Sequence, residues 1–141
     1  MIKSILLPVD LNHPESSAKA LAHALDMAKN HGATIHVLTV IPDYGSAWVG
    51  SFFPADFSKK AAAETQVALA NYIADNFPSD VKTKAHVLHG TIYKEITAAA
   101  DSVKADMIVM ASHRPEMKDY FLGPNAARVV RHARQSVLVV R

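Results

Sequence analysis

Apolar residues gather in five short runs along the chain, at residues 5–9, 33–41, 84–88, 107–111 and 137–140. Several of these runs are almost continuous valine, isoleucine, leucine or methionine. Strands that are buried on both faces of a parallel sheet have this pattern, whereas half-exposed strands alternate apolar and polar residues. The runs therefore predict five strands of a parallel sheet.

The segments between these strands predict four helices. In the first, Ala18, Leu21, Ala22, Leu25 and Ala28 recur at helical spacing. Gly32 suits its end, and Asn12 and Glu15 are expected to form a capping box around Pro14. The other helices are expected at about 56–77, after Thr91 and after Gly123. Their expected apolar stripes are Ala63, Val67, Ala70, Ile73 and Phe77, then Ile92, Ile96, Ala99 and Val103, and finally Ala126, Ala127, Val129, Val130 and Ala133.

The alternation of strands and helices predicts an α/β fold. Right-handed crossovers then place helices on both faces of an open five-stranded parallel sheet. With this number of elements the expected strand order is 3-2-1-4-5. The 141 residues match the length of one such domain, which we expect to span residues 1–141.

The composition narrows the chemistry. The chain has no cysteine, which excludes disulfides, iron–sulfur clusters, thiol catalysis and cysteine-built zinc sites. Its 15 Lys and Arg against 13 Asp and Glu give a formal net charge of +2, without a basic run that would indicate nucleic-acid binding. No apolar stretch reaches the roughly 18 residues that cross a membrane, and the start lacks the features of a signal peptide. We therefore expect a cytoplasmic protein with no nucleic-acid or membrane partner.

The strand order also predicts where a ligand binds. Open α/β sheets bind ligands beyond the carboxyl ends of their strands, where the strand order reverses. Here that point lies between strands one and four, and residues 8–10, 40–42, 111–114 and 123–126 converge on it. The fourth helix begins there, and the N–H groups at its start suit a phosphate. Because Pro124 has no N–H, the donors would be Asn125 and Ala126.

Several motifs resemble those of a known family. Residues 5–10, Ile-Leu-Leu-Pro-Val-Asp, resemble the first strand of the universal stress protein family, or UspA-like superfamily. Residues 107–113, followed by Gly123 and the closing strand at 136–140, resemble its later motifs. Ala-Ser-His-Arg-Pro at 111–115, with Leu122-Gly123 and Asn125-Ala126-Ala127, is most similar to the F/G branch. The resemblance spans essentially the whole chain, and it implies a Rossmann-like fold, stress-related regulation and, in many members, bound ATP or AMP.

The resemblance further implies a nucleotide site with a modified phosphate loop. Nucleotide-binding members carry the pattern G-x2-G-x9-G-[ST]. In this sequence Ala111, Arg114 and Gly123 stand at the glycine positions, Pro124 stands at the Ser/Thr position, and eight residues rather than nine separate Arg114 from Gly123. Arg114 adds a guanidinium that can hold a phosphate with two hydrogen bonds. We therefore expect a modified site for ATP or AMP, with Mg²⁺ as a candidate companion, rather than no site.

The same resemblance assigns roles to individual residues. Asp10 would contact the ribose or the adenine, Val9 and Val40 would flank the base, and His113 and Arg114 would approach the phosphates. The full set of expected cofactor-binding residues is Pro8, Val9, Asp10, Val40, Met110, Ser112, His113, Arg114, Gly123, Pro124, Asn125 and Ala126.

Structural roles compete with these assignments. Asp10 could equally cap the loop after the first strand, and His113 could fix its own loop by a hydrogen bond. Ser112 and His113 are adjacent and point apart on an extended chain, which argues against a catalytic dyad. The aromatic residues of segment 42–55 could cover an adenine, contact a protein or pack on their own domain. The spacing of the histidines indicates no metal site.

The last strand, at residues 136–141, reaches the C-terminus as an apolar edge that can pair with a second copy of the chain. The family resemblance implies dimers of this kind, so we expect a homodimer. We expect a regulatory binding protein that is not an enzyme, apart from slow, incidental ATP hydrolysis. The alternative is a stress protein without nucleotide that acts through its dimer surface. A small hydrolase or flavin protein ranks last, because the chain lacks a Gly-x-Ser-x-Gly elbow and a flavin signature.

Overall fold

The computed structural model describes residues 1–42, 57–112 and 123–141. In these residues one parallel sheet is built from β1 (Ser4–Pro8), β2 (Thr34–Pro42), β3 (Thr83–Gly90), β4 (Met107–Ala111) and β5 (Ser136–Val140). The strand order is β3-β2-β1-β4-β5. This arrangement confirms the predicted α/β fold and the predicted order 3-2-1-4-5.

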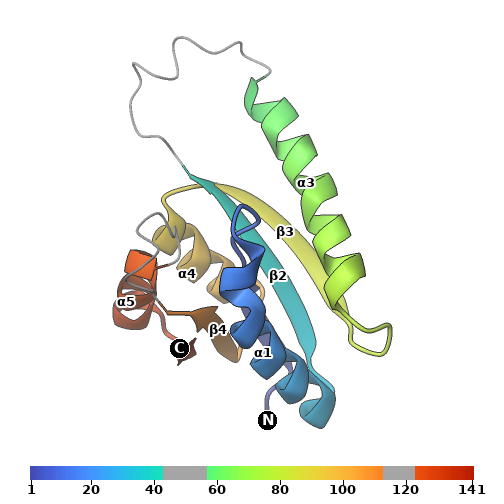
Figure 1. The fold of residues 1–141 in the computed structure, drawn as a ribbon. Helices are drawn as coiled ribbons and strands as arrows, with labels where there is room; N and C mark the ends of the chain where they lie inside the picture. The colour runs from blue at the N-terminus through green and yellow to red at the C-terminus, as the bar shows by residue number, and fades with distance from the viewer. Residues whose placement is uncertain (43–56, 113–122) are drawn as a thin grey trace.

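The helices cover both faces of this sheet (Figure 1). They are the 3-10 turn η1 (Pro14–Ser17) and the α-helices α1 (Ala18–His31), α3 (Phe57–Asn76), α4 (Ile92–Ser102) and α5 (Gly123–His132). The helices α1 and α3 pack on one face, and α4 and α5 pack on the other. In the part of the chain that the structure describes, no helix has both the length and the apolar content to cross a bilayer.

Two apolar cores follow from the alternation of side chains along each strand. Ile5, Leu7 and Val9 of the first strand and its continuation are fully buried under α1 and α3, and Leu6 is fully buried on the α4–α5 side. The central strands need apolar residues on both faces, which is why their sequences are nearly continuous apolar runs. In contrast, β3 lies at an edge of the sheet and is only partly buried along most of its length.

The two ends of the first helical segment differ in how well the sequence predicted them. Gly32 ends α1 with φ of 67°, and its N–H donates to the carbonyl of Ala28, as predicted. The predicted capping box of Asn12 and Glu15 is wrong. His13 stands at the N-cap of η1, where its side chain makes no capping hydrogen bond, and the Asn12 N–H donates instead to Asp10 Oδ1 at 2.9 Å.

The predicted apolar stripes of α3 and α5 need correction. In α3, Ile73 and Phe77 pack against the core as predicted, but Val67 is 62% exposed and Ala63 and Ala70 are exposed as well. Leu69 and Tyr72 of this helix are buried instead. This helix packs mainly against the edge strand β3, so only a narrow line of its surface meets the core. In α5, Ala126 and Val129 are buried as predicted, but Ala127 and Val130 are exposed. The stripe predicted for α4 is confirmed: its Ile96 and Ala99 are buried, and Ile92 and Val103 pack against them.

Gly90 and Gly32 offer a matched test of backbone strain. Both have positive φ, 148° and 67°. A Cβ atom on Gly90 would lie 2.6 Å from Glu95 Oε1, whereas a Cβ atom on Gly32 would meet nothing within 4 Å. We expect Gly90→Ala to lower the free energy of unfolding by about 2 kcal/mol and Gly32→Ala by about 1 kcal/mol. Urea denaturation measures both changes. Adding Glu95→Ala to Gly90→Ala should recover part of the loss, and equal losses at the two glycines would contradict this role of Glu95.

Candidate functional site

The candidate site begins where β1 loses its partner on one side. Pairing between β1 and β2 extends from Ser4 to Pro8, but pairing between β1 and β4 covers only Ile5 and Leu6. The Val9 N–H donates to the Leu38 carbonyl of β2, so the nitrogen of Pro8 points to the β4 side, where it has no hydrogen to donate. Pro8 therefore ends the ladder between β1 and β4 at the point where the strand order reverses.

A pocket of about 510 Å³ opens at the carboxyl ends of β1 and β2. It lies between these strand ends and the amino-terminal half of α3. The described residues that line it are Asp10, Leu11, Asn12, His13, Thr39, Val40, Ile41, Pro42, Glu64, Thr65 and Ala68. Six of these eleven residues are polar and five are apolar, a mixed lining that suits a small molecule with both polar and apolar groups.

The two threonine hydroxyl groups of the pocket already donate hydrogen bonds to backbone carbonyls. Thr39 Oγ1 donates to the Val9 carbonyl at 3.1 Å, and Thr65 Oγ1 donates to the Ala61 carbonyl at 2.7 Å. Each oxygen keeps its capacity to accept. With the carboxylates of Asp10 and Glu64, these two threonines make a lining rich in acceptors. No lysine or arginine occurs among the described lining residues.

Asp10 has the structural role that the sequence left open for it. Its side chain is buried, and Oδ1 accepts the Asn12 N–H at 2.9 Å, which turns the chain out of β1 toward η1. The backbone of the turn is completed by the His13 N–H, which donates to the Asp10 carbonyl at 3.1 Å. Because the residue also lines the pocket, capping does not prevent contact with a ligand.

The structure brings some of the other expected site residues together at this edge. Val40 lines the pocket with Asp10. The side chains of Val9 and Met110 are fully buried in the two cores, and Pro8 is buried as well. Ser112 follows β4, and its N–H donates to the Val140 carbonyl at 2.8 Å.

The expected phosphate-binding residues are described only in part. Gly123 begins α5 as expected, Pro124 is exposed, and the side chains of Asn125 and Ala126 are buried in the first turn. His113 and Arg114 lie outside the described residues, as does most of the aromatic segment 42–55. Among the described residues, no group of three or more His, Asp or Glu side chains could hold a metal ion.

The sequence analysis missed several lining residues. Glu64, Thr65 and Ala68 come from α3, whose orientation could not be read from an alanine-rich sequence. Asn12 and His13 follow Asp10 directly, and a signal for them did exist. Residues just after the first strand of an open α/β sheet lie at its ligand-binding edge.

Comparison with known proteins decides the family. The family model described as the universal stress protein family matches residues 1–141. Universal stress protein G from Escherichia coli O157:H7 is 35% identical over 147 residues, which covers 100% of both chains.

The chain belongs to the universal stress protein family.

Solved structures agree with this universal stress protein in fold. Hypothetical protein MJ0577 matches with a TM-score of 0.80 and 26% identity, covering 99% of this chain and 96% of that one. A universal stress protein in complex with cAMP matches with a TM-score of 0.67 and 19% identity, over 99% and 97% of the two chains. The universal stress protein from Archaeoglobus fulgidus in complex with dAMP has a TM-score of 0.65 and 20% identity, with 100% of both chains covered. The fold of this family member is therefore the Rossmann-like fold of its relatives.

The two threonines of this universal stress protein's pocket differ in what they stabilise. Thr39 is buried and joins β2 to the carbonyl of Val9, whereas Thr65 bonds within its own helix. We expect Thr39→Val to lower the free energy of unfolding by about 1–2 kcal/mol and Thr65→Val by less than about 0.5 kcal/mol. Thermal and urea unfolding followed by circular dichroism would measure both. Equal costs would contradict the larger stabilising role of the Thr39 hydrogen bond.

Proposed function

We propose that this chain is a cytoplasmic binding protein, not an enzyme, that holds an adenosine nucleotide, ATP or AMP, at the carboxyl edge of its sheet. The observation that carries the proposal is the pocket between the carboxyl ends of β1 and β2 and the helix α3. The complexes of relatives with cAMP and dAMP support adenosine nucleotides as the ligand class.

The chemistry of the lining supports the base and the ribose as the groups that enter the pocket. Asp10 and Glu64 offer acceptors to ribose hydroxyls or to an exocyclic amino group, and Val40 with Ile41 offers apolar surface to a base. Two carboxylates without a lysine or arginine among the described lining residues would repel a phosphate. The pocket therefore suits the uncharged part of a nucleotide.

The phosphates would then extend toward the start of α5. The amino end of a helix favours negative charge, and the first turn of α5 carries Asn125 and Ala126. In the proposed site Arg114 and His113, which precede this helix, also approach the phosphates, with Mg²⁺ as a possible companion of ATP. The strand ends around the ligand are formed by Pro8, Val9, Met110 and Ser112. The side chains of these residues do not contact the ligand directly. Gly123 and Pro124 bring the backbone of α5 to the same edge.

The decisive experiment identifies the ligand directly. The protein is purified without added nucleotide and denatured, and the released small molecules are identified by mass spectrometry. Calorimetry with ATP, AMP and adenosine, with and without magnesium, follows on stripped protein. Release of an adenosine nucleotide or its binding in calorimetry supports the proposal. No release, together with no heat of binding for any of the three, rejects it.

Ala68 provides a variant that blocks the pocket without touching its polar groups. This residue lines the pocket from an exposed position on α3, and Ala70 is exposed on the same helix but is not among the lining residues. We expect Ala68→Trp to weaken ATP and adenosine binding by more than about tenfold, because the indole occupies the pocket, with stability unchanged within about 0.5 kcal/mol. Ala70→Trp serves as the control and should bind like the parent protein. Equal binding by both variants would place the ligand elsewhere.

We also propose that two copies of the chain pair through β5. In the described residues β5 pairs only with β4, which leaves an apolar edge. The Val140 carbonyl points to β4, where it accepts the Ser112 N–H. Backbone groups of successive strand residues point to opposite sides, so the N–H of Val139 points to the free edge.

Substitutions of Val139 can therefore distinguish backbone pairing at the free edge from side-chain packing. We expect Val139→Pro to raise the dimer dissociation constant by more than about tenfold, because proline removes an edge donor and leaves the β4 ladder intact. Val139→Ala loses side-chain packing but keeps the N–H, and it should remain dimeric. Sedimentation equilibrium of both variants, with circular dichroism as the check on folding, measures the difference. A parent protein that is monomeric throughout would overturn the proposed dimer.

A further inference from the structure

Two histidines face each other across the pairing of β2 and β3. The Nδ1 atom of His36 lies 2.9 Å from Nε2 of His86, and their rings stack with centroids 5.1 Å apart and planes 27° apart. The register sets Lys84 opposite His36 and Leu38 opposite His86, so the two imidazoles are diagonal neighbours. His36 is buried, and His86 is half-buried.

The pair lies on the face of the sheet that α4 covers. Side chains alternate along a strand, so His36 shares its face with Leu38 and Val40, and His86 shares its face with Leu88. At 2.9 Å the pair forms an N–H···N hydrogen bond, which needs one ring nitrogen without a proton. A neutral or singly protonated pair can form this bond, and a doubly protonated pair cannot.

We propose that the His36–His86 pair is an acid-sensitive contact that holds the edge strand β3 to the sheet and thereby regulates the ligand pocket. The link to the pocket is α3, which packs mainly against β3 and contributes Glu64, Thr65 and Ala68 to the lining. Loss of the contact loosens β3 and displaces the α3 wall. This regulation of ligand binding rests on the proposed function, whereas the opening of β3 does not.

The surroundings of the pair disfavour its protonation. Burial lowers the pKa of His36, and the neighbouring His86 and Lys84 lower it further. Burial likewise lowers the pKa of His86, and Lys84 adds to the effect. The acidic groups of the covering helix face other partners: the Glu95 carboxylate lies over Gly90, and Asp101 accepts a hydrogen bond from Gln135.

The other charged and titratable groups of α4, of the turn after it and of α5 are exposed or make other contacts. Lys94 and Lys104 are exposed, and Tyr93 of α4 is stacked with His132 of α5, while Arg128 lies over the same tyrosine ring.

The lowered pKa values of the two histidines in the folded state mean that the unfolded chain binds more protons below about pH 6.5. The contribution of the pair to stability is therefore complete above that pH and is lost as the pH falls below it.

Hydrogen exchange on the ligand-free protein tests the contact itself. For each proton that the pair takes up on opening, the opening equilibrium shifts by about tenfold per pH unit. We expect β3 amides to exchange at least about tenfold faster at about pH 5.5 than at pH 7.5, after correction for intrinsic exchange, while β4 and β5 amides change little. Equal protection of β3 at the two pH values would overturn the proposal.

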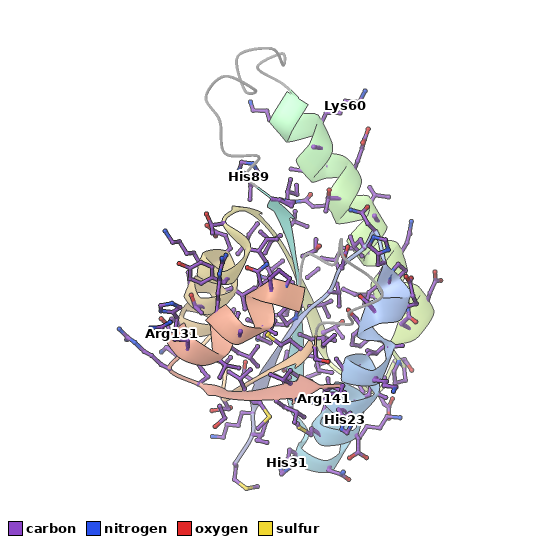
Figure 2. The ribbon with its side chains drawn as sticks, turned by 60° about the vertical axis from the view of Figure 1, so that its left-hand side comes forward. His23, His31, Lys60, His89, Arg131 and Arg141 are labelled. Carbon is purple, nitrogen blue, oxygen red and sulfur yellow. The ribbon has the colours of Figure 1, made fainter. Side chains whose placement is uncertain are left out.

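A matched pair of variants assigns the effect. His86→Gln keeps a polar side chain that does not titrate, and it should remove the pH dependence of β3 exchange. His89 is exposed on the same strand, at the carboxyl end of the sheet (Figure 2), so His89→Gln should behave like the parent protein. An unchanged pH dependence in His86→Gln would assign the effect to other groups and reject the pair. If His86→Gln does not fold, ¹⁵N-histidine NMR of the parent decides the question, because two coupled imidazole titrations below the ordinary histidine pKa of about 6.5 are required.

Binding of ATP with magnesium tests the regulatory part. We expect the affinity of the parent protein to fall about tenfold between pH 7.5 and 5.5, and that of His86→Gln to fall less than about twofold. Equal falls in the two proteins would reject the link to the pocket. A protein that binds none of ATP, AMP and adenosine at either pH would refute the proposed function, and the exchange data would still decide on the contact.

Discussion

The central position of β1 is the constraint on which the rest of the structure depends. This strand pairs with β2 on one side and β4 on the other, and Ile5, Leu6 and Leu7 are fully buried between the two helical layers. A strand in this position has to be apolar on both faces. The strand order reverses at β1. The segments that follow its two neighbours, β2 and β4, therefore run to opposite faces of the sheet. Pro8 adds to this separation, since its missing N–H ends the ladder toward β4 at the point where the strand order reverses.

The same constraint explains why most of the fold could be predicted from the sequence. Burial on both faces forces the apolar runs that mark β1, β2 and β4, and alternation with helices leaves few topologies for five parallel strands. The end of α1 could be predicted equally well, because Gly32 adopts a positive φ that costs glycine little free energy. Asp10 and Val40 could be placed at the pocket because both lie near the carboxyl ends of buried strands.

Tertiary context decided the features that the sequence did not reveal. The orientation of α3 depends on its contact with an edge strand, and a helix rich in alanine has no dominant apolar face, so Leu69 and Tyr72 are buried where Val67 was expected. The contact between His36 and His86 joins residues 50 positions apart and exists only in one register of β2 and β3. The capping box failed because Asp10, two residues before Asn12, competes successfully for the same N–H.

Most of the buried polar residues lie at the carboxyl edge of the sheet or at the helix starts beside it. Burying a polar group costs free energy unless a partner compensates, so such residues accumulate where a fold has a use for them. Asp10, Ser17, Thr39 and Asn125 are buried around the carboxyl ends of the strands or at the starts of the helices beside them. His36 departs from this pattern, because it lies near the opposite end of β2 on the covered face of the sheet. An apolar residue at this position would pack without desolvating an imidazole. The imidazole is compensated by His86 on the edge strand rather than by the core, which is why we propose that protonation of this one contact reaches the pocket wall formed by α3.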